Sequence, residues 1–307
     1  MNQTGVNRAA GPNRLLPLVV VAFAVLAVSH GAIFARMAAA PALAIAAWRL
    51  TIAAAIVALI LPWHWRTLRL VMRRAAGLAT LGASACLALH FATWITSLNY
   101  TSVSNSVILV NTSPIWVALF GWLSQTDRLT ARTLAAIALA VVGAAIIGFG
   151  GTHGVQGSVR GDLLALAGGA ALGGYLVFAR IARLQLPLVP YLFVCYTVAA
   201  VALWALALGS GAAMVGYDQA TWMALIGVAV ISQSLGHSSY NWALGFLRPS
   251  TVSVTLLGEG VIGSALAFMY FGEAVPRATW IGGPLVLAAT WLATSAALTD
   301  TQEPQRK

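Results

Sequence analysis

Seven polar or aromatic side chains stand out because they lie within long apolar stretches of the chain. They are His90, Trp94, Asn111, Tyr175, His237, Tyr240 and Glu259. Polar groups at the depth of a bilayer are costly, so they usually face a cavity or another helix. An imidazole can bind a carboxylate or a proton, a carboxylate can bind an amine, and an aromatic ring can stack on a ligand. These residues therefore predict a binding site for a small polar solute inside the membrane.

Glu259 is the sharpest of these candidates. It is the only one of the seven acids in the chain that is predicted deep inside a helix, because the others fall at helix ends or in the tails. A buried carboxylate either pairs with another group or takes up a proton. Two interpretations follow. Glu259 contacts a substrate amine or carries a proton, or it is a protonated acid that joins helices by hydrogen bonding to Ser113 or Asn111.

The spacing of the other candidates groups them on helix faces. His90 and Trp94 are four residues apart and share one face, and His237 and Tyr240 are three apart and share another. Each histidine could instead be a neutral hydrogen-bond partner. Trp94 and Tyr240 could instead pack between helices or lie in the aromatic belts at the membrane interfaces. Cys86 has metal-ligand spacing to His90, but no third and fourth ligand are identifiable, so no metal is predicted.

The composition indicates which elements position these residues. Of 307 residues, 60% are hydrophobic and only 8% are charged, whereas soluble domains carry about 25% charged residues. A helix needs about 20 mostly apolar residues to cross a bilayer. The chain contains ten such runs, at 15–35, 42–61, 75–97, 103–124, 130–150, 161–182, 187–209, 220–243, 250–272 and 277–298. The runs are continuous rather than alternating, so we expect an all-α integral membrane protein with ten transmembrane helices.

The runs differ in how polar they are. Polar residues concentrate in the third, fourth, eighth and ninth runs, which we expect to line a cavity, with the first and sixth beside them. The second, fifth, seventh and tenth runs are nearly all aliphatic and are expected to face lipid or pack behind the site. In the sixth run Gly169 and Gly173 read GxxxG, which predicts close helix packing. Pro114 should kink the fourth run.

The basic residues predict the orientation of the chain. With the N-terminus placed on one side, 13 of the 17 basic residues fall on that side and 4 on the other. The four are Arg36, Arg49, Arg160 and Arg277. Because basic residues are enriched in cytoplasmic loops, we expect both termini to be cytoplasmic, with tails at 1–14 and 299–307. The net charge of +10 thus serves orientation, and no nucleic-acid partner is predicted.

The chain also contains an internal repeat. The sequence Phe-Ala-Arg at 34–36 recurs at 178–180, an offset of 144, and an offset of 146 relates Asp127 to Glu273 and Trp94 to Tyr240. The repeats would span 15–150 and 151–298, with five helices each. An odd number of spans turns the second copy upside down relative to the first. Such inverted repeats place the substrate site at their interface, near the middle of the membrane.

This pattern resembles a known superfamily. Ten helices in a 5+5 duplication, with an acid closing the fourth helix of each half, are similar to the drug/metabolite transporters, and most to the EamA-type exporters of bacterial inner membranes. The family pattern runs from Ala243-Leu244-Gly245-Phe246 to Glu273, and the first half departs from it with Ser97 and Asp127. The resemblance covers residues 15 to 298 and is closest to exporters of amino acids, aromatic ones included. It implies a small-molecule substrate carried across the lipid bilayer by alternating access.

Other functions have weaker support. Gly258–Gly263 fits a dinucleotide fingerprint but lies in an apolar helix rather than after a strand, so no cofactor is predicted. The sole lysine is Lys307, so the chain has no P-loop, and no ATPase subunit is evident as a partner. The alternative to a transporter is an intramembrane enzyme or a structural membrane protein, for which His90, His237 and Glu259 are the only candidate catalytic set.

Overall fold

The structure is a computed structural model that describes residues 15–300 except 98, 101–105, 107–108, 128–129, 150–157, 273–274 and 276. The tail expected at 1–14 lies outside these residues, as do residues 301–307 of the tail expected at 299–307, Glu273, and the side chains of 148–149 and 296–300, whereas the backbone of residues 299 and 300 continues α14. Every regular element in the described part of the chain is helical. The expected all-α class is therefore confirmed.

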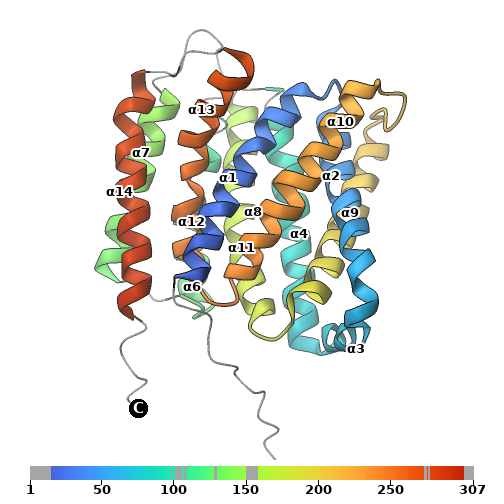
Figure 1. Ribbon diagram of the computed structural model, residues 1–307, viewed down its shortest axis with the longest axis horizontal. Helices are drawn as coiled ribbons and strands as arrows, with labels where there is room; N and C mark the ends of the chain where they lie inside the picture. The colour runs from blue at the N-terminus through green and yellow to red at the C-terminus, as the bar shows by residue number, and fades with distance from the viewer. Residues whose placement is uncertain are drawn as a thin grey trace, which may run out of the picture.

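The first half of the chain contains five consecutive helical spans (Figure 1). They are α1 (Leu16–Met37), α2 (Ala42–Ile60), α4 (Arg74–Ser97), a fourth span that ends in α6 (Ser113–Leu123), and α7 (Ala131–Phe149). Between α2 and α4 the chain forms three short helical turns, η1 (Leu61–His64), α3 (Trp65–Leu68) and η2 (Arg69–Met72).

The second half contains five further spans. They are α8 (Val159–Arg183), α9 (Leu188–Gly209), a composite of α10 (Gln219–Gly227), η3 (Val228–His237) and α11 (Ser238–Ala243), a broken span of α12 (Pro249–Leu256) and α13 (Gly258–Phe271), and α14 (Arg277–Asp300). Among the described helical segments, seven are long and apolar enough to cross a membrane, and α6 and α7 are shorter apolar helices.

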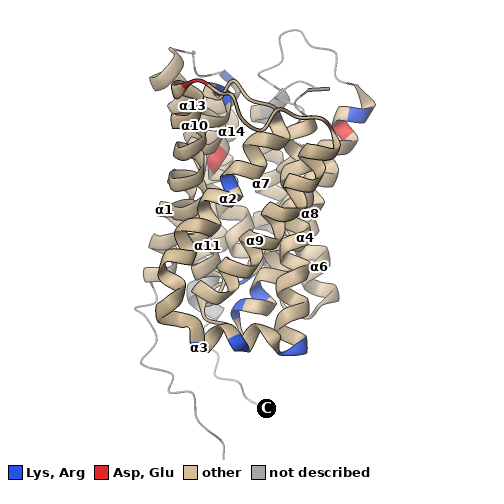
Figure 2. Cartoon of the chain, turned by 90° about the vertical axis from the view of Figure 1, so that its right-hand side faces the viewer, with Lys and Arg blue, Asp and Glu red and all other residues tan. Residues whose placement is uncertain are grey.

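The surface of the bundle is that of a protein surrounded by lipid. Large apolar side chains such as Trp63, Met72, Met269 and Trp280 are at least 73% exposed. A soluble monomer rarely exposes contiguous apolar surface on this scale. Figure 2 shows most of the charged positions at the two ends of the bundle, where the water-facing surfaces of a membrane protein lie.

The packing of the helices follows a two-fold pattern. The helix α4 packs on α8, and the composite span of α10, η3 and α11 packs on α1. The helices α2 and α9 form one pair and α7 and α14 another, and these pairs lie at opposite ends of the bundle (Figure 1). Exchanging the halves maps each of these pairs onto another pair or onto itself. A two-fold axis between the halves produces this exchange.

The two halves run in opposite directions. In Figure 1, α1 begins and α14 ends on the same side of the bundle. The start of α8 lies on the other side, because Ser158 N–H donates to Tyr100 O just beyond the end of α4, at 3.1 Å. The first helices of the two halves therefore start on opposite faces, and the expected inverted 5+5 arrangement is confirmed.

Three spans depart from a regular α-helix. The fourth span is interrupted by a turn at Asn111 and Thr112 before α6, whose first turn holds Pro114, so the irregularity expected there is present. The ninth span breaks at Leu257. The offset of 146 relates Asn111 to Leu257, so the two breaks are repeat equivalents. In the eighth span, η3 is a π-helix. Discontinuous helices and π-helical turns are both frequent at functional sites.

Glycines allow α8 to pack closely on α4 and α6. A Cβ atom added to Gly173 would lie 2.6 Å from the Cβ of Trp116, and one added to Gly169 would lie 2.8 Å from Leu109 O. A Cβ atom added to Gly174 would lie 3.0 Å from the Sγ of Cys86. The close packing predicted from the GxxxG motif is therefore confirmed.

We predict that Gly173→Ala destabilises the protein, because Trp116 is anchored in α6 and its backbone is also within 3.1 Å of the added Cβ. Overpacking of this kind costs about 1–3 kcal/mol. The matched control is Gly263→Ala in α13, where no atom lies within 4 Å of the added Cβ. That change should leave the free energy of unfolding unchanged or raise it by up to about 1 kcal/mol. Thermal unfolding in detergent tests both variants, and equal effects would contradict the packing account.

Candidate substrate site

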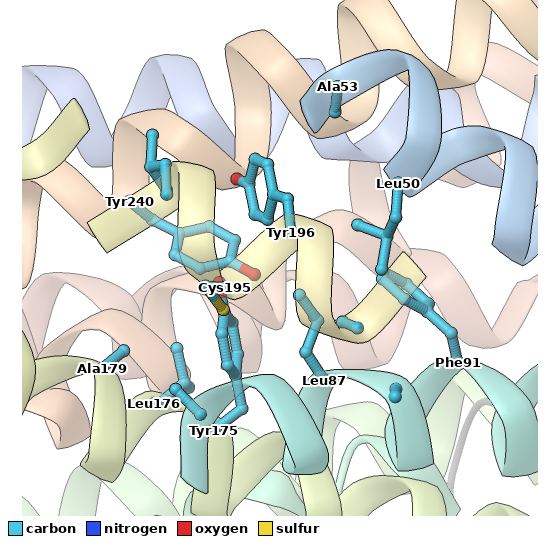
Figure 3. Close-up of a cluster of buried hydrophobic side chains, with 14 of the residues drawn as sticks. Leu50, Ala53, Leu87, Phe91, Tyr175, Leu176, Ala179, Cys195, Tyr196 and Tyr240 are labelled. Carbon is cyan, nitrogen blue, oxygen red and sulfur yellow. The ribbon is translucent and has the colours of Figure 1, made fainter. Parts of the chain in front are cut away.

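A continuous chain of rings runs through the interior of the bundle. It consists of Trp94, His90, Phe91, His237, Tyr240 and Tyr175. Successive ring centroids lie 4.8 to 6.3 Å apart. His90 and Trp94 stack with their planes only 11° apart, as their shared helix face predicts. These six rings, called the ring chain below, thus join α4 to the eighth span and to α8. Figure 3 shows the buried inner part of the ring chain, where Tyr175 and Tyr240 approach each other beside Cys195.

The middle of this chain marks the interface between the halves. Phe91 and His237 are related by the repeat offset of 146, and their ring centroids are 5.6 Å apart. Two equivalent residues can touch only where the axis that relates them passes between them. The ring chain therefore crosses the two-fold axis, with Trp94 towards one side and Tyr240, its repeat equivalent, towards the other.

Arg49 is buried beside this crossing point, with 4% of its surface exposed. Its Nε donates to Gln233 Oε1 at 2.6 Å, and its Nη2 donates to Ser232 Oγ at 3.1 Å. The guanidinium carbon lies 4.3 Å from the ring centroid of Phe91, a cation–π geometry. Gly31 in α1 makes room for this group, because a Cβ there would lie 2.7 Å from Ser232 Oγ.

The position of Arg49 corrects two expectations from the sequence. Counting Arg49 among the basic residues on the side opposite the N-terminus is wrong, because α2 turns it into the core. The expectation that the second and seventh runs lie behind the site is also wrong. Arg49 comes from α2, and Tyr196 of α9 shares a hydrogen bond with Ser238 at 3.1 Å. The missed signal was a single ionisable residue eight positions into an apolar run.

The histidines each use one ring nitrogen inside the protein. The Nδ1 of His90 lies 2.9 Å from Gly168 O, a contact in which the ring nitrogen donates. The Nδ1 of His237 shares a hydrogen bond with the hydroxyl of Tyr240. Neither Nε2 forms a hydrogen bond within the described residues. Both histidines therefore act as internal hydrogen-bond partners and still keep a second nitrogen for a ligand.

Tyr175 and Asn241 connect α8 to α11. Asn241 Nδ2 donates to the hydroxyl of Tyr175 and to His237 O, at 2.6 Å in each case. Both side chains are completely buried. This pair fixes the inner end of the ring chain. Asn241 was not among the predicted site residues, although it lies one residue after Tyr240 in a run of polar positions.

Glu259 and Asn111 lie at the two equivalent helix breaks. Glu259 is in the first turn of α13, directly after the break at Leu257, and is half-buried. It interacts electrostatically with Arg49. Asn111 is half-buried in the turn before α6. Within the described residues, neither residue has a hydrogen bond to the ring chain. Glu259 has none to Ser113 or Asn111, so the helix-joining bond of its second interpretation is not seen.

Three buried polar atoms in and around the ring chain have no hydrogen-bond partner in the described part of the protein. They are Trp94 Nε1, Gln233 Nε2 and Asn241 Oδ1. Buried polar groups in native proteins nearly always have a partner, so each such atom calls for an explanation. A bound polar solute or water would supply the missing partners. The ring chain and its neighbours therefore combine apolar ring faces with two donors and one acceptor that have no partner within the described residues.

Comparison with known proteins identifies the relatives of the chain. The model of the EamA-like transporter family matches residues 15–149 and again 159–295, one match for each half. An uncharacterized transporter of Archaeoglobus fulgidus is 26% identical over 202 residues, which cover 65% of this chain and 69% of the relative. One solved crystal structure superposes on this chain with a TM-score of 0.77. The superposition covers 95% of this chain and 100% of the chain in that structure. The sequence identity is 19%, so this likeness shows the fold alone.

We predict that Tyr175→Phe destabilises the protein without changing its fold, because Asn241 loses a buried acceptor. The expected loss is about 0.5–2 kcal/mol in the free energy of unfolding. The control is Tyr270→Phe in α13, where the side chain is 48% exposed. Unfolding in detergent should show a loss for Tyr175→Phe alone. The network described above would be contradicted if the two variants unfolded alike.

Proposed function

Because the chain belongs to the EamA-like transporter family, we propose that it exports amino acids or similar small zwitterionic metabolites across the bacterial inner membrane. The family assignment covers both halves and makes the protein a multi-pass membrane transporter. The observation that carries the substrate class is the ring chain at the two-fold axis, with the acid Glu259 at a helix break nearby.

The chemistry of a zwitterion fits the groups gathered at this interface. An ammonium group is attracted by the carboxylate of Glu259 and by aromatic faces, where cation–π attraction contributes roughly 0.5–2 kcal/mol. A carboxylate can accept hydrogen bonds from donors such as a histidine ring or the amide of Asn111. An aliphatic or aromatic side chain can pack against Trp94, Tyr175 and Tyr240. The proposed site therefore uses His90, Trp94, Asn111, Tyr175, His237, Tyr240 and Glu259.

Alternating access would follow from the arrangement of the halves. On the side where α1 begins, Asp127 of the first half accepts a hydrogen bond from Ser250 N–H of the second half at 2.9 Å. On the same side, Arg132 donates to Ser295 Oγ at 2.7 Å. These contacts between the halves favour closure of that side, so we propose that transport requires them to break as the halves rearrange around the axis.

We expect Trp94→Ala, His237→Ala and Glu259→Gln to weaken transport of an amino acid by purified protein in liposomes. Removing one buried partner costs about 1–3 kcal/mol, or roughly 5- to 150-fold in affinity. The control is Val201→Ala in α9, where the side chain is 65% exposed on the bundle surface. If all three variants transport like Val201→Ala, these residues do not form the site.

We expect both termini to be cytoplasmic, because the side where α1 begins also carries Arg66, Arg69, Arg73 and Arg74. The test is labelling of Gln302→Cys by a membrane-impermeant thiol reagent in intact cells, after replacement of Cys86 and Cys195. The label should react only after the cells are opened. Ser210→Cys on the opposite side should react in intact cells. The reverse pattern would overturn the orientation.

A further inference from the structure

We infer that Arg49 binds the carboxylate of the substrate and that Arg49 and Glu259 together select solutes that carry both charges. This inference rests on the proposed transport of a small zwitterion. It adds the residue that recognises the anionic end, which the sequence pattern did not identify. The support comes from the charge balance of the site, its unused donors and the broken repeat symmetry.

The first argument is the charge balance. A guanidinium buried at membrane depth costs free energy unless a counter-charge and hydrogen bonds surround it. The hydrogen-bond partners of Arg49 are the neutral side chains of Gln233 and Ser232, and no carboxylate forms an ion pair with it among the described residues. Glu259 acts on it only electrostatically. A substrate carboxylate would provide the close counter-charge that the protein lacks.

The second argument is the set of donors that remain. A guanidinium has five N–H donors in a fixed plane, and the hydrogen bonds to Gln233 and Ser232 use only two of them. The amide Nε2 of Gln233, the residue that holds Nε of Arg49, is also buried without a partner. Planar donors of this kind match the two oxygens of a carboxylate. A neutral oxygen acceptor could use these donors but would bring no counter-charge, and an ammonium group could use none of them.

The third argument is that the two halves differ in charge at equivalent positions. The offset of 146 relates Arg49 to Cys195 and Glu259 to Ser113, so the equivalent positions in the other half are uncharged. Cys195 is completely buried and Ser113 is 3% exposed, and both fit the same helix framework without a charge. The two charges are thus additions to a symmetric scaffold. They are of opposite sign and act on each other across the interface, which suits a solute with two opposite charges.

Three probes that share one side chain separate these contributions. Phenylalanine carries both charges, phenethylamine only the ammonium, and 3-phenylpropionate only the carboxylate. A probe without a carboxylate leaves Arg49 without a counter-charge, and a probe without an ammonium brings its carboxylate close to Glu259. We therefore expect the wild-type protein to bind phenylalanine more tightly than either single-charge probe.

The experiment measures binding of the three probes to the purified full-length protein by thermal stabilisation, and their competition in liposome counterflow of radiolabelled phenylalanine. In Arg49→Gln, the affinity for phenylalanine and 3-phenylpropionate should fall about 10- to 100-fold, whereas that for phenethylamine should not fall. In Glu259→Gln, the affinity for phenethylamine should fall and that for 3-phenylpropionate should rise. Val201→Ala in α9, whose side chain is 65% exposed on the bundle surface, is the control and should leave all three affinities unchanged.

The unfolding temperature without ligand shows whether each variant is folded. If Arg49→Gln does not fold, Arg49→Lys replaces it in the experiment. This variant keeps the charge but loses the planar donors, so its affinity should fall for the two carboxylate probes only. A purely structural role of Arg49 predicts an equal loss for all three probes, and that result would overturn the inference. Absence of phenylalanine transport by the wild-type protein would refute the proposed function alone, because binding of 3-phenylpropionate that depends on Arg49 would still support the anion site. If the wild-type protein binds neither carboxylate probe, the anion site itself is refuted.

Discussion

A guanidinium inside an apolar helical bundle has to be surrounded by hydrogen-bond acceptors and by faces that tolerate charge, and the interface between the halves is arranged around Arg49 in this way. The π-helix η3 supplies Gln233 and Ser232, α4 supplies the ring of Phe91, and Gly31 lets α1 approach the same place. Four spans from both halves therefore meet at one side chain. Arg49 lies seven residues, or about 10 Å, beyond the start of α2, and only 4% of its surface is exposed.

The two-fold repeat accounts for the arrangement of the helices, and the residues of the candidate site are those that depart from it. Equivalent helices pair across the axis, equivalent breaks interrupt the fourth and ninth spans, and Phe91 touches its own equivalent His237. A symmetric frame of this kind would allow the halves to exchange roles in the alternating access proposed above. The features that carry chemistry are asymmetric. Arg49, Glu259 and the π-helix each occur in one half only, so they would favour a single orientation of the proposed substrate within a nearly symmetric bundle.

Much of the frame could be predicted from the sequence, because hydropathy over 20 residues is a strong signal. The described helices begin and end within two or three residues of the predicted runs wherever both ends are described. The break before α6 could be expected from Pro114. The equivalent break at Leu257 has no proline, but Gly258 and Gly260 follow it directly, and the repeat offset points to the same place.

The parts of the site that were missed have a common physical cause. A hydropathy average over the second run hides one arginine among aliphatic residues, and counting charges for orientation assigned Arg49 to a surface. The inward direction of Arg49 depends on how α2 packs against α9 and η3, which no local pattern encodes. The shared helix face of His90 and Trp94 could be predicted from helix periodicity alone. The link from Phe91 to His237 depends on the pairing of the halves.

A structure of the protein bound to phenylalanine would test the central claim most directly. That claim is that a buried cation and a half-buried acid hold the two ends of one zwitterion at the interface of the halves. The account predicts the carboxylate of phenylalanine within hydrogen-bonding distance of the Arg49 guanidinium, the ammonium towards Glu259, and the side chain against the ring chain. A bound molecule that leaves Arg49 in contact with Gln233 and Ser232 alone, with its carboxylate held elsewhere, would contradict it.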